Sequence, residues 1–352
     1  MGKHTESVTP GTESRTPQTR NTSSPYHVKE VIFSNDVEGV RLAGTVTWPG
    51  GDSPGPAVIL IPGGGAHDRD YSIGRHRPFH VLADYLTRRG IPVLRFDERG
   101  VGGSTGDPAK STCENYAGDV LAGVRFLQRF GESTSEGIGL IGHSEGGMVA
   151  SLAAEKSGDI AFLVLLATPG LPGREYQMQY EESTGKAMGL SEEAIARRRS
   201  VQEAVFEVLL REHRRGNAET QIREIYRQYF PGIPEERIRA GLARFLSPGF
   251  RYNLTYDPAS VLPDVRCPVL AIYGERDLHV PPERNAARME EILRNRPDSP
   301  PSKVITLPGL NHFFQAHNDA DPFNYGTNEE AISPVVPDTI ASCIKNYSNW
   351  DD

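Results

Sequence analysis

A serine stands at the centre of residues 138–150 (IGLIGHSEGGMVA), where an apolar run gives way to a glycine-rich turn and then to a helix-forming segment. Ser144 lies in the pattern Gly-x-Ser-x-Gly, and this strand-turn-helix context is typical of a nucleophile elbow. Such a turn strains the serine backbone, so only residues without a bulky Cβ fit two positions away on either side, here Gly142 and Gly146. The pattern predicts a nucleophilic serine, with a buried serine in a glycine-rich turn as the alternative.

Two further glycine-rich stretches follow apolar runs. Residues 63–65 (GGG) leave backbone N–H groups open to an anion or an oxyanion. A phosphate-binding loop is disfavoured because no Gly-Lys-Ser/Thr ending follows, and a merely flexible loop is the other alternative. Residues 98–106 (ERGVGGSTG) could pass for a dinucleotide fingerprint, but the spacing fails and Pro108 stands where a helix should open, so we expect no nucleotide cofactor.

The elements that would position these residues can be read from the apolar pattern. Residues 27–49 read as two strands around a turn. Continuous apolar runs suited to strands buried on both faces follow, at 57–62, 91–97, 138–143 and 161–169. Helical patterns occupy 78–90, closed by Gly90, and 114–130. This alternation predicts an α/β fold with a mostly parallel central sheet flanked by helices.

The composition changes after Pro172. From there to about residue 241 the chain is rich in Glu, Arg and Gln in amphipathic runs, and no buried strand recurs until 265–274. Ser191 is expected as a helix N-cap and Gly216 as a C-cap. We therefore expect a helical insertion that sits beside the strand ends as a cap, after which strands at 265–274 and 303–309 and helices at 284–295 and from Pro337 complete the fold. The predicted division is a tail at 1–25, a core at 26–170 and 264–352, and a helical cap at 171–263.

Composition limits the possible partners and locations. Lys and Arg number 38 against 46 Asp and Glu, and the formal charge of −8 argues against nucleic acid. No run approaches the roughly 18 apolar residues that a membrane helix requires. Three distant cysteines fit neither a disulfide framework nor a zinc site, so we expect no metal and a reducing, cytoplasmic location. Residues 1–25 lack the apolar region of a signal peptide and are expected to be disordered.

Over about residues 27–350 the chain resembles the α/β-hydrolase superfamily, and residues 63–70 and 78–106 resemble bacterial serine esterases of that superfamily. The family order of nucleophile, acid and histidine then reads Ser144, Asp277 and His312, the last two in YGERD and LPGLNHFF. Histidine would accept the serine proton, and the acid would orient and stabilise the imidazolium. Glu275 and His317 are rivals, but Glu275 lies nearer the strand end and the Gly-x-Asn-His context favours His312.

The same resemblance implies an oxyanion hole formed by two backbone N–H groups. One belongs to Glu145, directly after the nucleophile, and the other to Gly64, with Gly65 as the neighbouring candidate. His143 is expected to pack or to hydrogen-bond, and not to act as the base. Residues 67–70 are expected to brace their loop with ion pairs more than to contact substrate, and Asp97 and Arg99 to stabilise a turn. Side chains from the cap either line the pocket or pack in the helices: Tyr176, Met178 and Tyr180.

The function implied is hydrolysis of a carboxylic ester of a small molecule, through an acyl-enzyme and without a cofactor. A thioesterase, an amidase or peptidase, and an acyl transferase use the same triad, and the fold does not distinguish them. A non-catalytic ligand-binding relative is a further alternative, disfavoured because all three triad residues are present. The substrate would bind under the cap, whereas its acyl length and the oligomeric state are not predicted.

Overall fold

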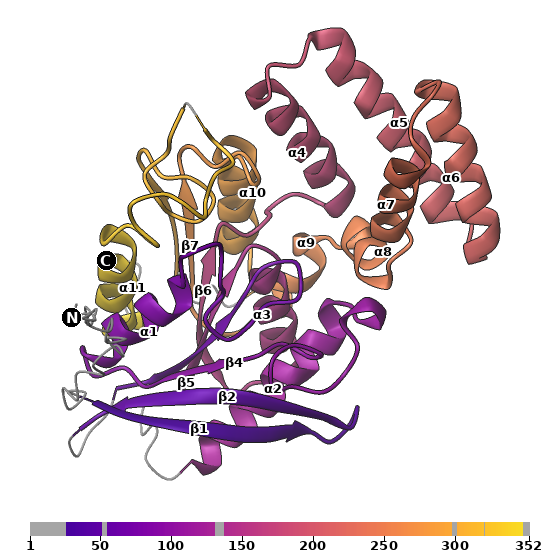
Figure 1. Cartoon of the computed structure of the whole chain (residues 1–352). Coiled ribbons are helices and arrows are strands. Elements are labelled where there is room, and N and C mark those ends of the chain that lie inside the picture. Colours follow the sequence, from indigo (N-terminus) through magenta and orange to yellow (C-terminus); the bar gives the residue numbers. More distant parts are fainter. Residues whose placement is uncertain (1–25, 51–54, 131–136, 298–300, 320, 348–352) are drawn as a thin grey trace, which may run out of the picture.

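The computed structural model describes residues 26–50, 55–130, 137–297, 301–319 and 321–347 (Figure 1). Its centre is an eight-stranded sheet in the order β1-β2-β4-β3-β5-β6-β7-β8. The strands are β1 (Tyr26–Asn35), β2 (Val40–Pro49), β3 (Ala57–Ile61), β4 (Val93–Phe96), β5 (Ile138–His143), β6 (Ile160–Leu166), β7 (Val269–Gly274) and β8 (Ser302–Leu307). β1 and β2 form an antiparallel hairpin, β2 is antiparallel to β4, and the remaining pairs are parallel. The prediction of a mostly parallel sheet is confirmed, whereas the predicted tail lies outside the described residues.

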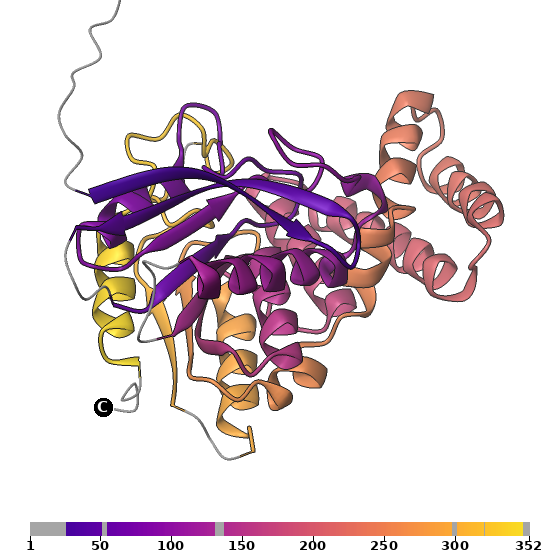
Figure 2. The ribbon, with the colours of Figure 1, turned by 90° about the horizontal axis from the view of Figure 1, so that it is seen from below.

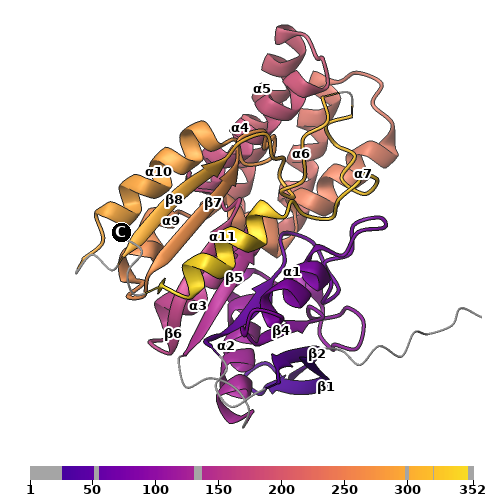
Figure 3. The ribbon, with the colours of Figure 1, turned by 90° about the vertical axis from the view of Figure 1, so that its left-hand side faces the viewer.

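Helices cover both faces of this sheet, and Figure 3 shows one face with its two helices in front. That face carries α1 (Pro78–Thr87) and α11 (Val335–Ile344), and the opposite face carries α2 (Cys113–Arg129), α3 (Glu145–Lys156) and α10 (Pro282–Arg294). Successive strand residues point to opposite faces: Val58 and Leu60 pack with α1 and α11, whereas Ile59 packs with α2 and α3. Because both faces are buried, the central strands read as unbroken apolar runs.

Between β6 and β7 the described chain forms helices and no strand. They are α4 (Gly173–Ala187), α5 (Glu192–Arg211), α6 (Arg215–Tyr229), α7 (Glu235–Phe245), α8 (Pro248–Thr255) and α9 (Pro258–Val261). Figures 1 and 2 show α5, α6 and α7 projecting away from the sheet, and α4 to α8 are called the inserted helices below. They bury an apolar cluster of their own, which includes Phe206, Ile222 and Leu242.

The helix boundaries within the insertion test two sequence predictions. Ser191 caps α5 as predicted, because its hydroxyl accepts a hydrogen bond from the Ala194 N–H at 3.3 Å. The prediction that Gly216 ends this helix is wrong, since α5 ends at Arg211 and Gly216 lies in the first turn of α6. Residues 212–214 (EHR) separate the two helices, and they contain neither glycine nor proline to mark the end of a helix.

Helix α4 is tied to the carboxyl ends of the sheet strands. The Ser183 hydroxyl donates to the carbonyl of Leu278 at 2.5 Å, in the loop that follows β7. The buried Asn285 amide, in the first turns of α10, donates to Gln179 Oε1 at 2.7 Å. These contacts hold α4 over the edge where the strands end, which is the edge where parallel sheets commonly bind ligands. None of the helices within the described ranges combines the length and apolarity that crossing a membrane requires.

Candidate active site

Ser144 lies at the sharp turn between β5 and α3, with φ 54° and ψ −120°. This backbone conformation is rare for a residue with a side chain and indicates local strain. A Cβ placed on Gly142 would collide with the backbone of Gly146, and a Cβ on Gly146 would collide with the Ile61 and Pro62 carbonyl oxygens. The turn therefore requires glycine on both sides of the serine, as the sequence predicts for a nucleophile elbow.

Asp277 and His312 follow β7 and β8, and their side chains form a buried pair. His312 Nδ1 lies 2.8 Å from Asp277 Oδ2, and the two residues are 4% and 3% exposed. The other carboxylate oxygen, Oδ1, accepts hydrogen bonds from the backbone N–H groups of His279 at 2.7 Å and Val280 at 2.9 Å. With Nδ1–H donating to the carboxylate, Nε2 is left as the ring nitrogen able to accept a proton.

The charge state of Asp277 follows from opposing effects. Burial raises the pKa of its carboxyl. The charge and hydrogen bond of His312, together with the Val280 N–H, lower this pKa by more than burial raises it. The net result is a pKa below the ordinary value, so the carboxylate is ionised at neutral pH. An ionised, hydrogen-bonded carboxylate fixes the imidazole orientation and stabilises its protonated form.

Ser144 and His312 line one cavity of about 270 Å³, which also contains Gly64 and Glu145. Within the described residues no hydrogen bond joins the Ser144 hydroxyl to the His312 ring. In an unliganded active site such bonds are often long and shorten only in the complex with substrate. The cavity thus brings together the serine and the histidine predicted from the sequence, with the aspartate behind the histidine.

The two rival residues have other partners. Glu275 Oε2 accepts a hydrogen bond from the Gly309 N–H at 2.9 Å, which ties the loop after β7 to the loop after β8. His317 Nε2 lies 3.4 Å from Asp319 Oδ1. His317 does not line the cavity, and it is Asp277, not Glu275, that hydrogen-bonds to His312, so the geometry favours Asp277 and His312.

Two backbone donors border the same cavity. A Cβ on Gly64 would lie only 3.1 Å from Glu145 Oε2, so these two residues approach each other closely. In the described part of the chain, neither the Gly64 N–H nor the Glu145 N–H has a hydrogen-bond acceptor. Glu145 begins α3, and the first N–H groups of a helix have no partner within it. Unpaired donors of this kind can stabilise an oxyanion. The neighbouring candidate Gly65 does not line the cavity.

His143, the residue before Ser144, is hydrogen-bonded to the backbone of His312. Its Nε2–H donates to the His312 carbonyl at 2.8 Å, and its Nδ1 lies 3.0 Å from the Tyr71 hydroxyl. Burial, and next the neighbouring His312, lower the pKa of His143 to about 3. A neutral ring with both nitrogens engaged is a structural hydrogen-bonding group, as the sequence predicts, and not a base.

The segment after β3 combines loop bracing with one cavity residue. Arg69 Nη2 lies 2.9 Å from Asp97 Oδ2, and Asp68 Oδ1 accepts a hydrogen bond from the Asp70 N–H at 3.1 Å. These contacts confirm the predicted bracing by charged side chains. His67 instead lines the cavity beside the glycines.

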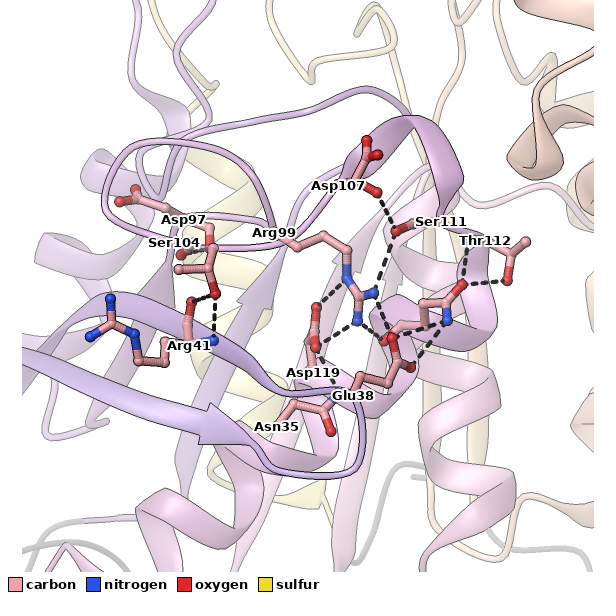
Figure 4. A network of polar contacts seen from close by, with 12 residues as sticks. Asn35, Glu38, Arg41, Asp97, Arg99, Ser104, Asp107, Ser111, Thr112 and Asp119 are labelled. Atoms are coloured by element: carbon pink, nitrogen blue, oxygen red, sulfur yellow. Dashed lines mark hydrogen bonds and ion pairs between the residues drawn. The ribbon is translucent and has the colours of Figure 1, made fainter.

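The loop at 98–106, after β4, is held by the network in Figure 4. Arg99 Nε donates to Asp119 Oδ2 at 2.8 Å, and Arg99 Nη1 donates to Glu38 Oε2 at 2.7 Å. The Ser104 hydroxyl donates to the Asp97 carbonyl at 2.6 Å. The predicted turn-stabilising role of Asp97 and Arg99 is therefore confirmed.

The inserted helices contribute part of the cavity wall. Tyr176 and Tyr180 of α4 line it, whereas Met178 packs in the apolar cluster of the inserted helices. Asn253 of α8 reaches the cavity and donates a hydrogen bond to Glu145 Oε2. Burial raises the pKa of the Glu145 carboxyl and the Asn253 bond lowers it, with a net rise.

Three of these cavity features were not predicted from the sequence. His279 stacks near His312 with ring centroids 4.6 Å apart, and burial, then His312, lower its pKa to about 3. His279 lies two residues after Asp277, and this proximity in the sequence could have identified it as a cavity residue. The Glu145 side chain and its partner Asn253 carry no such signal, because they meet only when α8 docks. No group of three or more His, Cys, Asp or Glu side chains in the described ranges is arranged to hold a metal ion.

Comparisons with known proteins agree with this architecture. Residues 58–323 match the model of the alpha/beta hydrolase family, and the chain belongs to that family. It is 28% identical over 326 residues to Esterase EstD of Thermotoga maritima, covering 91% of this chain and 69% of that protein. The Pyrococcus furiosus esterase Pf2001 (TM-score 0.54, covering 92% of each chain) and the α/β hydrolase GrgF from Penicillium sp. sh18 (TM-score 0.57, 92% and 99%) are each 17% identical and share the fold.

Proposed function

We propose that the protein is a serine esterase that hydrolyses a carboxylic ester of a small molecule through an acyl-enzyme. The observation that carries this proposal is the buried His312–Asp277 pair, at 2.8 Å, beside a cavity that also contains the strained Ser144. The similarity to a protein named as an esterase supports ester bonds as the substrate class. Cys113 and Cys267 are buried and form no disulfide within the described structure, which supports the proposed cytoplasmic location.

In the proposed mechanism His312 Nε2 takes the proton from the Ser144 hydroxyl as Oγ attacks the ester carbonyl carbon. The N–H groups of Gly64 and Glu145 bind the resulting oxyanion, and Asp277 stabilises the imidazolium. Collapse of the tetrahedral intermediate expels the alcohol oxygen, which receives the proton from His312. A water molecule, deprotonated by His312, then attacks the acyl-enzyme, and the released serine recovers its proton as the carboxylic acid leaves.

The inserted helices would act as a cap over the acyl group. Tyr176 and Tyr180 of α4 line the cavity that contains Ser144, and α4 is anchored to the loop after β7. The cavity volume of about 270 Å³ is near the lower end of small-molecule sites, which favours a short acyl group. Thioesters, amides and acyl transfer to an alcohol are the alternatives, since the same triad serves them.

Labelling with a fluorophosphonate probe tests the nucleophile. Wild type should label, Ser144→Ala should not, and Ser157→Ala, at the far end of α3, should label like wild type. In p-nitrophenyl ester hydrolysis, Ser144→Ala and His312→Ala should each lower kcat about 10⁶-fold and Asp277→Asn about 10⁴-fold, because the three act as a unit. Rates from p-nitrophenyl acetate upward, compared with a thioester and an anilide, then separate the substrate classes.

Two outcomes would contradict the proposal. Equal labelling of Ser144→Ala would show that another residue is the nucleophile. Failure of wild type to label, with hydrolysis no faster than buffer, would identify a non-catalytic member of the family.

A further inference from the structure

A second and larger cavity lies within the inserted helices, away from Ser144. It has a volume of about 680 Å³ and is bordered by α4, α5, α6, α7 and the turn between α6 and α7. None of its lining residues lines the catalytic cavity. This space is called the arginine groove below, after the four arginines that border it: Arg197, Arg198, Arg237 and Arg244.

The positive charge of this groove is largely uncompensated. Glu181 is the one carboxylate among its lining residues, and it pairs with Arg198 at 3.1 Å. Among the described residues Arg197, Arg237 and Arg244 have no carboxylate partner. Three of the four other arginines on α6 and α7 pair with carboxylates: Arg223 with Glu219, Arg227 with Glu235 and Arg239 with Glu236, whereas Arg215 donates to the Leu246 carbonyl. Most arginines of α6 and α7 outside the groove thus have a carboxylate partner, whereas Arg237 and Arg244 in the groove do not.

A buried polar group in the groove also lacks a partner. Gln202 of α5 is 5% exposed and lines the groove, and its Oε1 is buried with no hydrogen-bond partner. Leaving such a group unsatisfied lowers stability, so buried amides normally find a partner. The wall of the groove therefore contains an amide oxygen whose hydrogen-bonding capacity is not used within the described chain.

The remaining walls are apolar and aromatic. Val201 and Phe245 are buried, and Tyr226 is partly buried on the facing helix α6. A Cβ on Gly241 would lie 2.8 Å from the Tyr226 hydroxyl, so a glycine in α7 permits the tyrosine to lie close against that helix. A ligand in the groove would therefore meet a flat apolar surface next to the arginines.

We infer that the arginine groove binds an amphipathic organic anion, with a carboxylate or a similar acidic group on an aromatic or aliphatic body. The acidic group would pair with Arg197, Arg237 and Arg244, the body would lie against Tyr226 and Phe245, and a polar group would satisfy Gln202. This binding is independent of ester hydrolysis. The arginine groove adjoins the catalytic cavity through Arg244, whose Nη2 donates to Oε1 of the cavity residue Gln177 at 3.2 Å.

The test uses a fluorescent anion and its uncharged analogue. Full-length Ser144→Ala is titrated with 1-anilinonaphthalene-8-sulfonate and with N-phenyl-1-naphthylamine, which lacks the sulfonate. Because this variant is inactive under the proposed mechanism and binding is read directly, the result does not depend on catalysis. We expect one sulfonate probe per chain, bound at least 10-fold more tightly than the uncharged analogue.

Substitutions of groove residues test whether the probe binds in the arginine groove. Arg237→Gln and, as a second case, Arg197→Gln should each raise the Kd of the anionic probe about 3- to 10-fold and leave that of the uncharged analogue unchanged. Both arginines are exposed, so both variants should fold. Arg239→Gln is the matched control, since Arg239 lies on the same helix, pairs with Glu236 and does not line the groove. Gln202→Leu should also weaken binding while raising the Tm of the unliganded protein, because it removes an unsatisfied amide.

Three results would overturn the inference. The first is equal affinity for the two probes. The second is an equal loss of affinity in Arg239→Gln and Arg237→Gln, which would indicate non-specific attraction to surface charge. The third is loss of probe binding after wild type has been covalently blocked at Ser144, which would place the probe in the catalytic cavity.

Discussion

Two glycine-rich loops leave the same edge of the sheet, one after β3 at 63–65 and one after β4 at 98–106, and they serve opposite purposes. In the second loop the backbone is closed on itself: the Gly100 N–H donates to the Thr105 carbonyl at 3.0 Å, and the Ser104 N–H to the Val101 carbonyl at 2.8 Å. In the first loop the Gly64 N–H has no acceptor within the described chain, and Gly64 borders the cavity that contains Ser144. One loop uses glycine to make tight turns, the other to leave donors accessible.

The comparison shows that glycine content alone does not distinguish a binding loop from a structural one. What separates them is the partner of each backbone N–H group and the surrounding charge. The loop after β4 is locked by the buried Arg99, whose guanidinium joins two carboxylates from different elements. In the described part of the chain no arginine side chain hydrogen-bonds to residues 63–65, and the Gly64 carbonyl pairs with His67 instead. Substitutions in the two loops should therefore separate stability from catalysis.

The largest expected effect is the loss of Arg99. Its side chain and that of Asp119 are 5% and 1% exposed, so Arg99→Met leaves a buried carboxylate without its partner. Removing one member of such a pair typically costs about 3–5 kcal/mol, and we expect that fall in the free energy of unfolding. Guanidinium chloride denaturation measures it, with the exposed Arg41→Met as a control expected within about 0.5 kcal/mol of wild type. An unchanged midpoint for Arg99→Met would remove the structural role assigned to this loop.

A pair of alanine substitutions sharpens the comparison. Gly64→Ala places a methyl group 3.1 Å from Glu145 Oε2, which disturbs the proposed oxyanion donors, and we expect kcat to fall about 10- to 100-fold with little loss of stability. Gly103→Ala places a methyl group 2.7 Å from the Ala43 Cβ, and this overpacking should cost about 1–3 kcal/mol of stability with kcat unchanged. Ester hydrolysis and thermal unfolding of both variants check the assignment. If both variants lose the same property, the two loops do not differ in the way described.

The smallest expected effect is the contribution of His143 to the pH dependence of stability. The ring of His143, next to Ser144, contacts the Tyr71 hydroxyl in the segment after β3. The pKa of His143 is about 3 in the folded protein, against roughly 6.5 when unfolded. Below pH 6.5 the unfolded chain therefore binds a proton that the folded protein excludes, and stability falls as the pH drops towards 3. The slope contributed by this group is at most about 1.4 kcal/mol per pH unit.

Denaturation midpoints at pH 7.5, 6.0 and 5.0 measure this slope. His143→Gln should flatten the dependence, whereas His213→Gln, an exposed residue after α5, should leave it as in wild type. An identical slope in wild type and His143→Gln would show that His143 is protonated in the folded protein.

Much of the fold could be predicted because its central strands are buried on both faces. Runs such as residues 57–61 then contain only apolar residues, and the glycines around Ser144 are required by local collisions. The Asn253–Glu145 hydrogen bond could not be predicted, since it joins residues 108 positions apart and depends on how α8 docks. The end of α5 at Arg211 could not be predicted either, because residues 212–214 contain no glycine or proline that would mark it.

The position of the inserted helices has a consequence for synthesis on the ribosome. β6 and β7 are hydrogen-bonded neighbours, yet residues 167–268 separate them in the chain. At about 5–20 residues per second, the edge of β6 waits roughly 5–20 s for its partner strand. Throughout that interval a strand of seven largely buried residues has an unpaired edge, while Ser144 has already been made and its proposed partners Asp277 and His312 have not. Under the proposed mechanism the nascent chain is inactive during the same interval in which this edge is open to aggregation. Pairing of β7 covers the edge, whereas activity has to wait for β8 and for His312, which follows it.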